Sequence, residues 1–512
     1  MNLFLYLKKI ASNKEKLSLL ALFIIALLPR ILLLSKGPFH WDSLAMIICG
    51  EKTLRGKICL AQDIGAYGSI LTNSLFIFVG SYLGLSSEQA VLFFVSFFSA
   101  VSILIFYLFI KEFFKTEKLA LYSAVLFAFL PTYFSVSTFG RTDHVFFYIS
   151  FFCSLIFLAK FIRTNNIKYL IISSIFLGTS FTFRFPELLI SSVYILFLII
   201  YGKRILIKNK RIAIKKGMLK EIAIITLLSI LSFLSIYFHS IPEVLKRIEA
   251  HTSTHAQFGS WLGILSPLIL TASLYILDTL SIFGILFALI GIFLYLREDK
   301  EKTFLLLFWF GITFFFFGNY STLSPRYLIS SEISLIIFIS YAIWKIAQKF
   351  QYKYQIALSY LLLLTITASM FLPLYPVLEF RHSHNMQKEF AMYLKNITEE
   401  HAVILAKDEG IFLRYYLGST NRTITGFPST CNSTKMKEFF ERMDSWLGEN
   451  RSVYIIETGF AYDPCRLFLN TLLQNYNLTL VGKHLNEDWH HKSISPGLYE
   501  ERVFKITKRK KI

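Results

Sequence analysis

Long apolar runs recur along most of the chain, and each is close to the length that a helix needs to cross a bilayer. The runs are continuous rather than alternating, so they predict membrane-spanning helices and exclude the strands of a membrane β-barrel. Beyond residue 376 the sequence becomes polar. The pattern predicts about eleven spans, at residues 17–35, 88–111, 119–137, 144–162, 168–184, 186–202, 221–240, 278–296, 303–318, 327–346 and 355–375.

The composition supports this prediction. Of the 512 residues, 54% are hydrophobic and the mean hydropathy is +0.54, whereas a soluble domain needs a polar shell. Lys8, Lys9, Lys14 and Lys16 precede the first run, which is too long for the core of a cleaved signal peptide. We therefore expect an uncleaved first span with the N-terminus on the cytoplasmic side.

The distribution of charge orients the spans. Eight basic residues and no acidic one lie between Lys203 and Lys220, as expected of a cytoplasmic loop. The net charge of +20 therefore reflects membrane topology, and we expect no nucleic-acid partner. If successive loops alternate sides from a cytoplasmic N-terminus, the loops on the outer side are residues 36–87, 138–143, those near 185, 241–277, 319–326 and everything after 376.

One further apolar run, Ile70 to Leu85, would invert every later loop if it crossed the membrane. We therefore predict that it lies in the outer interface, because translocating eight cations is less favourable than an interfacial helix. Glycosylation sequons agree, since all six fall on the predicted outer side. They begin at Asn319, Asn396, Asn421, Asn432, Asn450 and Asn477.

Four of the five cysteines fall in predicted outer segments. Cys49 and Cys59 lie in the first outer loop, and Cys431 and Cys465 lie in the tail, so each pair is a candidate disulfide in an oxidising compartment. Their connectivity stays open at this point. Cys153 falls within a span and is expected in the helical core.

Residues 377–512 differ from the rest of the chain, because short strand-like and helical segments alternate there. This pattern predicts a small α/β domain with a partly parallel sheet, and no glycine-rich phosphate fingerprint indicates nucleotide binding. The chain is thus predicted to be a polytopic α-helical membrane protein (residues 1–376) with a C-terminal extracytoplasmic α/β domain. Strands are expected near 401–408, 422–426, 452–458 and 478–484, and helices near 410–418, 434–449 and 465–476.

Charged side chains gather at the predicted outer ends of the spans, where such groups usually mark function. The candidate site residues are His40, Asp42 and Asp63 in the first loop, Arg141, Asp143 and His144 in "FGRTDH", Arg184 and Glu187 in "FRFPE", and Arg326 and Tyr327 in "SPRY".

Several of these residues also have a structural reading. Asp42 and Asp143 each precede a helix and fit N-terminal caps. Arg184 and Glu187 fit a structural ion pair. Arg30, near the outer end of the first span, fits a side chain that extends along the span to the polar interface.

Two further features are weaker indications of a bound ligand. Arg326 also fits a contact with lipid headgroups. His251 and His255 have the i, i+4 spacing of metal ligands, but the surrounding loop offers no evident third ligand.

A sugar linked to a polyprenyl phosphate would use such a set of residues. Its tail would lie in lipid and its phosphate at the outer interface. The phosphate is a good leaving group, so an Arg or Lys must compensate its growing charge. A carboxylate at the interface would serve as the base for an acceptor hydroxyl.

The order of the motifs resembles the GT-C superfamily of glycosyltransferases, in a layout close to protein O-mannosyltransferases (glycosyltransferase family 39) and lipid A aminoarabinose transferases. That pattern has an Arg near the end of the first span, a first-loop Asp, a short helix ending in Gly, an interfacial helix and a later Arg-x-x-Asp-like element. Here these are Arg30, "HWDS", "TLRGK", "DIGAYGSILTNSLFIFVG" and "FGRTDH". The resemblance covers roughly the first 200 residues.

The resemblance implies that Asp42 is the catalytic base and that Asp143 supports the site. The donor would be a polyprenyl (dolichyl)-phosphate sugar in the lipid bilayer, and the acceptor a protein, lipid or glycan. The family has metal-dependent and metal-independent members, so a divalent cation stays open. Ser43 stands where the family usually has Glu, and "GAYGS" replaces its Pro-Pro. The implied substrate-binding residues are His40, Asp63, Arg141, His144, Arg184, Glu187, Arg326 and Tyr327.

Two alternatives come from other classes: a transporter or lipid flippase, and a non-catalytic membrane scaffold. Transporters tend to have internal repeats and polar sites at the midplane. No matching halves occur here, and the charges lie at one face. Oligosaccharyltransferase catalytic subunits share the expected architecture, but their Trp-Trp-Asp signature is absent from the tail. The expected location is the cell membrane, with several passes.

Overall fold

A computed structural model gives the fold. Within the residues that it describes, the chain divides into two compact units. The first is built from residues 14–34 and 49–379, and the second from 35–48, 380–487 and 498–508. The described residues are 14–57, 59, 67–202, 205–208, 211–214, 217–237, 268, 271, 275–318, 324–407, 410–428, 432–463, 465–487 and 498–508.

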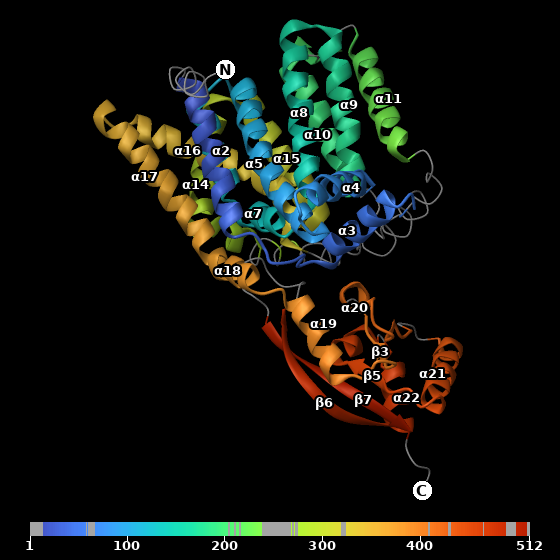
Figure 1. Cartoon of the computed structure of the whole chain (residues 1–512). Helices are drawn as coiled ribbons and strands as arrows, with labels where there is room; N and C mark the ends of the chain where they lie inside the picture. The colour runs from blue at the N-terminus through green and yellow to red at the C-terminus, as the bar shows by residue number, and fades with distance from the viewer. Residues whose placement is uncertain are drawn as a thin grey trace. The chain divides into compact units, whose positions relative to one another are not determined.

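The first unit is a bundle of apolar helices (Figure 1), and the chain is a multi-pass membrane protein, as predicted. Each predicted span contains a helix or a pair of helices. Seven described helices are long and apolar enough to cross a membrane, or eight if one bent pair is a single span, so the total of eleven stays a prediction. The helices are α2 (Lys14–Leu32), α5 (Ser87–Phe114), α6 (Glu117–Ala128), α7 (Pro131–Thr138), α8 (Thr142–Thr164), α9 (Ile167–Phe183), α10 (Ile190–Tyr201), α11 (Met218–Tyr237), α14 (Leu277–Glu298), α15 (Lys300–Gly318), α16 (Ile329–Gln348), α17 (Tyr352–Phe371) and α18 (Tyr375–Ser383).

The bent pair consists of α6 and α7, which meet at 56°. Pro131 begins α7 and has no N–H, so the hydrogen-bond ladder is interrupted there. Arg30 Nη2 donates to the carbonyl of Ala128, the last residue of α6, at 2.8 Å. Arg30 also donates to the Ala26 carbonyl and to Ser137 Oγ, and it is fully buried. The reading in which Arg30 extends to the interface is therefore wrong, because its guanidinium joins α2 to the bend.

The predicted interfacial run forms α4 (Tyr67–Tyr82), which runs across the ends of α8 and α9 (Figure 1). Thr142 Oγ1, at the start of α8, donates to Asn73 Oδ1 at 2.6 Å. A Cβ added to Gly68 would lie 2.6 Å from Thr182 Oγ1, in the last turn of α9. The start of α8 and the end of α9 lie together, so α4 covers that end of the bundle. This placement supports the predicted interfacial position.

The segment Ser330–Glu332 at the start of α16 is fully buried, and its polar side chains hydrogen-bond to four neighbouring helices. Buried polar groups are unfavourable unless they are hydrogen-bonded. These bonds therefore fix where α16 begins, and with it the preceding 3₁₀ helix η3 (Pro325–Leu328). The partners are Tyr148 of α8, Thr313 of α15, Thr279 of α14 and Thr132 of α7.

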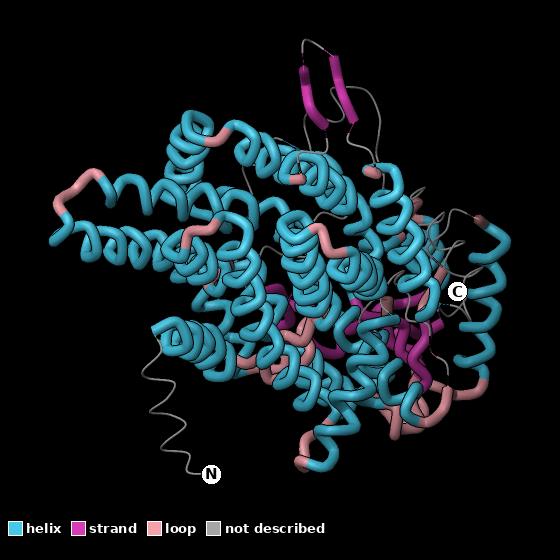
Figure 2. Tube along the Cα trace, turned by 90° about the horizontal axis from the view of Figure 1, so that it is seen from above, coloured by secondary structure: helices cyan, strands magenta, loops and turns pink. Residues whose placement is uncertain are grey.

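A short antiparallel hairpin lies between α10 and α11. It pairs β1 (Ile205–Lys208) with β2 (Arg211–Ile214), and Figure 2 shows it standing apart from the helices. The strands fall in the basic loop that the sequence places on the cytoplasmic side, and the sequence pattern did not predict them.

The second unit contains a five-stranded sheet in the order β4-β3-β5-β7-β6. The first three strands in this order pair in parallel, and β7 pairs antiparallel with β5 and β6. The predicted α/β domain with a partly parallel sheet is confirmed, although β7 was not predicted. The strands are β3 (Val403–Leu405), β4 (Thr423–Thr425), β5 (Val453–Ile456), β6 (Tyr476–Glu487) and β7 (Leu498–Lys508).

Helices cover both faces of this sheet because buried residues alternate along its strands. Ile404 packs on one face with α19 (Met386–Ile397) and α20 (Gly410–Leu417). Its neighbours Val403 and Leu405 pack on the other face with α21 (Ser433–Gly448) and α22 (Leu467–Asn475). This alternation is the two-residue period of a β-strand.

The structure settles part of the disulfide connectivity that the sequence left open. Cys49 and Cys59 form a disulfide. Cys465 is also disulfide-bonded, and Cys431 lies outside the described residues. Cys153 is a free thiol within α8, as expected.

Candidate functional site

A tight turn between α7 and α8 positions the residues of "FGRTDH". Gly140 has φ +83°, a conformation that side chains rarely adopt, and a Cβ there would lie 3.1 Å from Leu92. The turn places Arg141 just before α8 and Asp143 in its first turn. Arg141 Nε and Nη2 donate to the two Asp143 carboxylate oxygens at 2.9 and 2.7 Å. Asp143 is thus held by a bidentate ion pair, and the helix-cap reading does not describe it.

Arg184 joins this pair from the end of α9. Its Nη1 lies 3.3 Å from Asp143 Oδ2 and 2.8 Å from His144 Nε2. Arg184 is 4% exposed and His144 is fully buried. The predicted candidates of the second and third outer segments are therefore brought together, although they are about 40 residues apart.

Glu187 lies opposite Arg184 on the 3₁₀ helix η1 (Phe185–Leu189). Pro186 is the second residue of that 3₁₀ helix, and its missing N–H prevents the helical ladder of α9 from continuing. Arg184 Nε lies 3.4 Å from Glu187 Oε1, and Ser330 Oγ donates to Glu187 Oε2 at 3.0 Å. The expected ion pair is present, and it belongs to the same cluster as Asp143.

Tyr327 connects a further arginine to the cluster. The guanidinium of Arg184 lies 5.4 Å from the centre of the Tyr327 ring, and that of Arg326 lies 5.1 Å from it. Tyr327 also stacks on Phe317 of α15. Such cation–π contacts hold guanidinium groups near an aromatic face. Through the Tyr327 ring, Arg326 is therefore connected to Arg184 and to the residues that Arg184 contacts.

These seven residues form what we call the arginine cluster: Arg141, Asp143, His144, Arg184, Glu187, Arg326 and Tyr327. The cluster holds three guanidinium groups and two carboxylates. A cluster in which guanidinium groups outnumber carboxylates is suited to an anionic ligand.

His40 and Asp42 belong to the second compact unit. The cap reading requires a helix that begins at Ser43, but α3 (Trp41–Leu54) begins two residues earlier, so Asp42 lies inside its first turn. His40 Nδ1 lies 3.1 Å from the Asp42 backbone N and 3.2 Å from Asp42 Oδ2. Nδ1 cannot accept from the amide and donate to the carboxylate at once, so these contacts describe the ring without and with a proton on Nδ1, respectively.

Residues of the same unit hold the segment before α3 in place. The Lys36 backbone N donates to the Arg381 carbonyl at 2.9 Å, and the Arg381 guanidinium lies 3.6 Å from the centre of the Phe39 ring. Arg381 is buried, as are His40 and Asp42. The segment that carries the proposed base is therefore anchored to the start of the C-terminal part of the chain.

Three other candidates lie outside the described residues: Asp63, His251 and His255. Among the described residues, no group of three or more His, Cys, Asp or Glu side chains is arranged to hold a metal ion.

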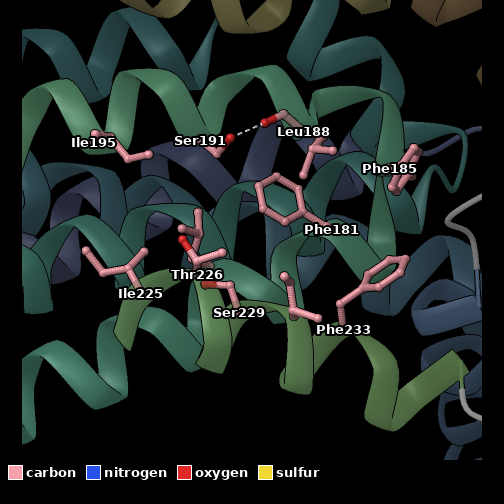
Figure 3. Close-up of a pocket in the computed structure, with 11 residues that line it drawn as sticks. Phe181, Phe185, Leu188, Ser191, Ile195, Ile225, Thr226, Ser229 and Phe233 are labelled. Atoms are coloured by element: carbon pink, nitrogen blue, oxygen red, sulfur yellow. Dashed lines mark hydrogen bonds between the residues drawn. The ribbon is translucent and has the colours of Figure 1, made fainter. Parts of the chain in front are cut away.

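An apolar cavity of about 350 Å³ lies between α9, η1, α10 and α11 (Figure 3). It is lined by Phe181, Phe185 and Phe233, with the rings of Phe185 and Phe233 5.8 Å apart. Ser191 also lines it, but its hydroxyl donates to a backbone carbonyl. Arg184 directly precedes Phe185, so the cavity begins next to the arginine cluster.

Sequence reasoning missed several polar residues around the cluster. Asn73, Thr142, Tyr148 and Ser330 contact it or one another, and all are buried. Thr142 lies inside "FGRTDH" and Ser330 is followed by Ser331 and Glu332, so polar residues next to charged ones at the span ends are the signal that would have found them.

The family model for dolichyl-phosphate-mannose-protein mannosyltransferases matches residues 72–236, from α4 to α11. Among curated proteins, none matches this chain. The crystal structure of ArnT from Cupriavidus metallidurans bound to undecaprenyl phosphate has 10% sequence identity and a TM-score of 0.53, covering 95% of this chain and 96% of that one. Its apo structure has 11% identity, the same coverage and a TM-score of 0.53.

A cryo-EM structure of a mutant arabinofuranosyltransferase AftD from Mycobacteria has 12% identity and a TM-score of 0.50. It covers 95% of this chain and 41% of that one. At these identities the solved structures show a shared fold. With the family model, they confirm the resemblance to GT-C glycosyltransferases of the mannosyltransferase and aminoarabinose-transferase type.

Proposed function

We propose that the chain is a membrane glycosyltransferase that moves a sugar from a polyprenyl-phosphate donor to a hydroxyl on a protein, lipid or glycan. The observation that carries the proposal is the arginine cluster, most of whose residues are buried, at the end of the bundle that α4 covers. The comparisons support it, because the description of the matching family names dolichyl-phosphate-mannose and the ArnT structure contains undecaprenyl phosphate.

Arg184 and Arg326 are the proposed ligands of the donor phosphate. Both lie over Tyr327, whereas Arg141 is engaged in its bidentate pair with Asp143. Negative charge grows on the phosphate as the sugar leaves it. Cations already held in a water-poor site stabilise that charge without reorganisation.

Asp42 is the proposed general base. Its carboxylate takes the proton of the acceptor hydroxyl, and the acceptor oxygen bonds to C1 of the sugar. The electron pair of the broken C1–O bond stays with the phosphate, which needs no proton. With no proton on Nδ1, His40 accepts from the Asp42 amide, so in that tautomer Nδ1 does not donate to the carboxylate.

The apolar cavity beside Phe185 is the proposed place for the first part of the prenyl chain. Its volume of about 350 Å³ is at the low end of ligand cavities, so it fits the phosphate-proximal units and leaves the rest in lipid. Its position beside Arg184 matches a donor whose phosphate is bound by that side chain.

The site is proposed to face an oxidising, extracytoplasmic compartment, and the protein to lie in the cell membrane. The Cys49–Cys59 disulfide supports this side for the end of α3, since disulfides persist mainly in such compartments. The disulfide at Cys465 supports the same side for the C-terminal domain, residues 377–512.

The test measures sugar transfer by the purified protein in detergent. The protein is given a panel of polyprenyl-phosphate sugars and hydroxyl acceptors, and the products are identified by mass. Replacing Asp42 by Asn should lower the rate at least about 100-fold, the size of a lost general base. Glu51→Gln, further along the same helix, is the matched control and should transfer normally. Movement of polyprenyl phosphate between leaflets without transfer would favour a flippase, and neither activity would favour a scaffold.

A further inference from the structure

We infer that α4 supplies a further donor-binding residue, Asn73, whose amide N–H groups bind a phosphate oxygen of the donor. The inference rests on the proposed function, because it adds a residue to the same site. It gives α4 a direct role in recognition beyond its position at the interface.

The buried face of α4 contacts α8 and α9, two of the elements that carry the arginine cluster. Gly68 packs against Thr182, two residues before Arg184. Phe76, one turn after Asn73, packs against Phe146 of α8 at 5.8 Å between ring centres. Asn73 lies between these two contacts, so α4 places it over the start of α8.

Thr142 fixes the orientation of the Asn73 amide. The Thr142 hydroxyl donates to Asn73 Oδ1 at 2.6 Å, which makes that atom the acceptor and leaves Nδ2 as a donor of two hydrogens. Asn73 is fully buried, and within the described part of the chain Nδ2 has no acceptor. Buried donors in native structures are nearly always satisfied, so an acceptor is expected at this position.

Two neighbouring side chains also present donors. The guanidinium of Arg184 can only donate, so His144 Nε2 must accept from it and the neutral ring carries its proton on Nδ1. Neither His144 Nδ1 nor Arg184 Nη2 has a partner among the residues described. Thr142, which orients Asn73, is next in sequence to the Asp143 that binds Arg184.

Three buried groups that donate and find no acceptor among the described residues indicate a ligand rich in acceptor oxygens. A sugar phosphate provides these oxygens, whereas a prenyl chain provides none. The other source of acceptors is ordered water, which would satisfy Asn73 without any role in donor binding. The two sources differ in what a change at Asn73 does to donor affinity.

The experiment measures binding of undecaprenyl phosphate to the full-length protein in nanodiscs. Asn73→Asp keeps the acceptor for Thr142 but replaces the donors by a carboxylate, so affinity should fall at least about tenfold, as for the loss of one charged hydrogen bond. Asn73→Leu, which cannot donate, should also weaken binding. Thr142→Val, which removes the bond that orients the amide, should weaken it less than either.

Ser74→Ala is the matched control, because Ser74 is buried beside Asn73 but already donates to the Ile70 carbonyl. It should bind as the wild type does. If the wild type binds and Asn73→Asp and Asn73→Leu both bind within about twofold of it, Asn73 is satisfied by water and the inference is overturned. If Asn73→Asp does not fold, Asn73→Leu and Thr142→Val decide by the same criterion. No binding by the wild type would instead refute the proposed function.

Discussion

The ion pair between Arg184 and Glu187 allows stability and donor binding to be separated. The perturbation is a cycle of three variants: Arg184→Met, Glu187→Met and the double variant. Both side chains are almost fully buried, 4% and 1% exposed, and Arg184 Nε lies 3.4 Å from Glu187 Oε1. Methionine keeps an unbranched side chain in the space that each residue fills.

The expected magnitudes follow from this geometry. At an effective dielectric constant of about 20, charges 3.4 Å apart attract by about 5 kcal/mol, which is offset by the cost of taking both out of water. Removing Arg184 alone leaves Glu187 with the Ser330 hydroxyl as its partner among the described residues. The free energy of unfolding should then fall by about 3–5 kcal/mol. The double variant leaves neither charge of the pair buried, so it should recover a large part of that loss.

Reversible unfolding in mixed detergent micelles measures the stability of each variant, and undecaprenyl phosphate binding measures its site. Arg184→Met and the double variant should both lose donor affinity, whereas Glu187→Met should keep the cation that binds phosphate. If the two single effects on stability add to within about 0.5 kcal/mol, the residues are not coupled and the reasoning fails. Full donor affinity in the stable double variant would remove Arg184 from the phosphate site.

Three further predictions concern other parts of the chain. Arg30→Lys should lower the unfolding temperature nearly as much as Arg30→Met, because one ammonium cannot replace the guanidinium bonds to Ala26, Ala128 and Ser137; full stability in the lysine variant would contradict this. The Cys49–Cys59 disulfide closes a loop of about ten residues, so reducing it should lower the free energy of unfolding by up to about 3 kcal/mol. An impermeant maleimide should then label the freed thiols in intact cells. Labelling only after permeabilisation would show the opposite orientation. Burial alone would raise the pKa of Glu399, but hydrogen bonds from Lys505 and Tyr454 lower it to about 2. The ionised Glu399 carboxylate therefore stabilises the folded state above pH 4.5, and this stabilisation is lost as the pH falls towards 2. Glu399 is half exposed, so the effect should be below about 1 kcal/mol and should appear as a slightly flatter acid limb of stability against pH in Glu399→Gln; identical limbs would show that the pair contributes nothing.

The sequence predicted the helices of the first unit well, because length and hydropathy determine them locally. The predicted span 88–111, for example, corresponds to α5 at Ser87–Phe114. The bend between α6 and α7 was not predicted, although Pro131 marks it. A proline signals a break in the ladder, but its angle depends on tertiary contacts such as those of Arg30.

The C-terminal sheet shows where local patterns fail. The strand β7 was missed because Glu500, Glu501 and Arg502 interrupt the apolar alternation that marks a strand. In the structure, Glu501 accepts hydrogen bonds from the Thr458 backbone N and from the Tyr499 hydroxyl, so a buried charge is accommodated within the sheet. Such compensation comes from residues distant in sequence, and periodicity does not contain it.

The candidate site was predicted in composition, but of its contacts only the Arg184–Glu187 ion pair was predicted. Arg141, Asp143, Arg184 and Glu187 were all named from charge at the span ends. Which of them pair depends on helix packing, and so does the use of Ser330 as a partner of Glu187. The first outer loop was predicted to belong with the spans, whereas residues 35–48 group with the second compact unit through contacts such as that of Phe39 with Arg381.

The central proposal is that Asp42 and the arginine cluster serve the same transfer reaction from a polyprenyl-phosphate donor. The most direct test is photo-crosslinking with a polyprenyl phosphate that carries a diazirine beside its phosphate, followed by mass-spectrometric mapping of the labelled peptides. The account predicts that peptides containing Asp42 and peptides containing Arg141–His144 are both labelled, and that excess undecaprenyl phosphate prevents both. Label confined to one of the two, under conditions in which the lipid is bound, would contradict it.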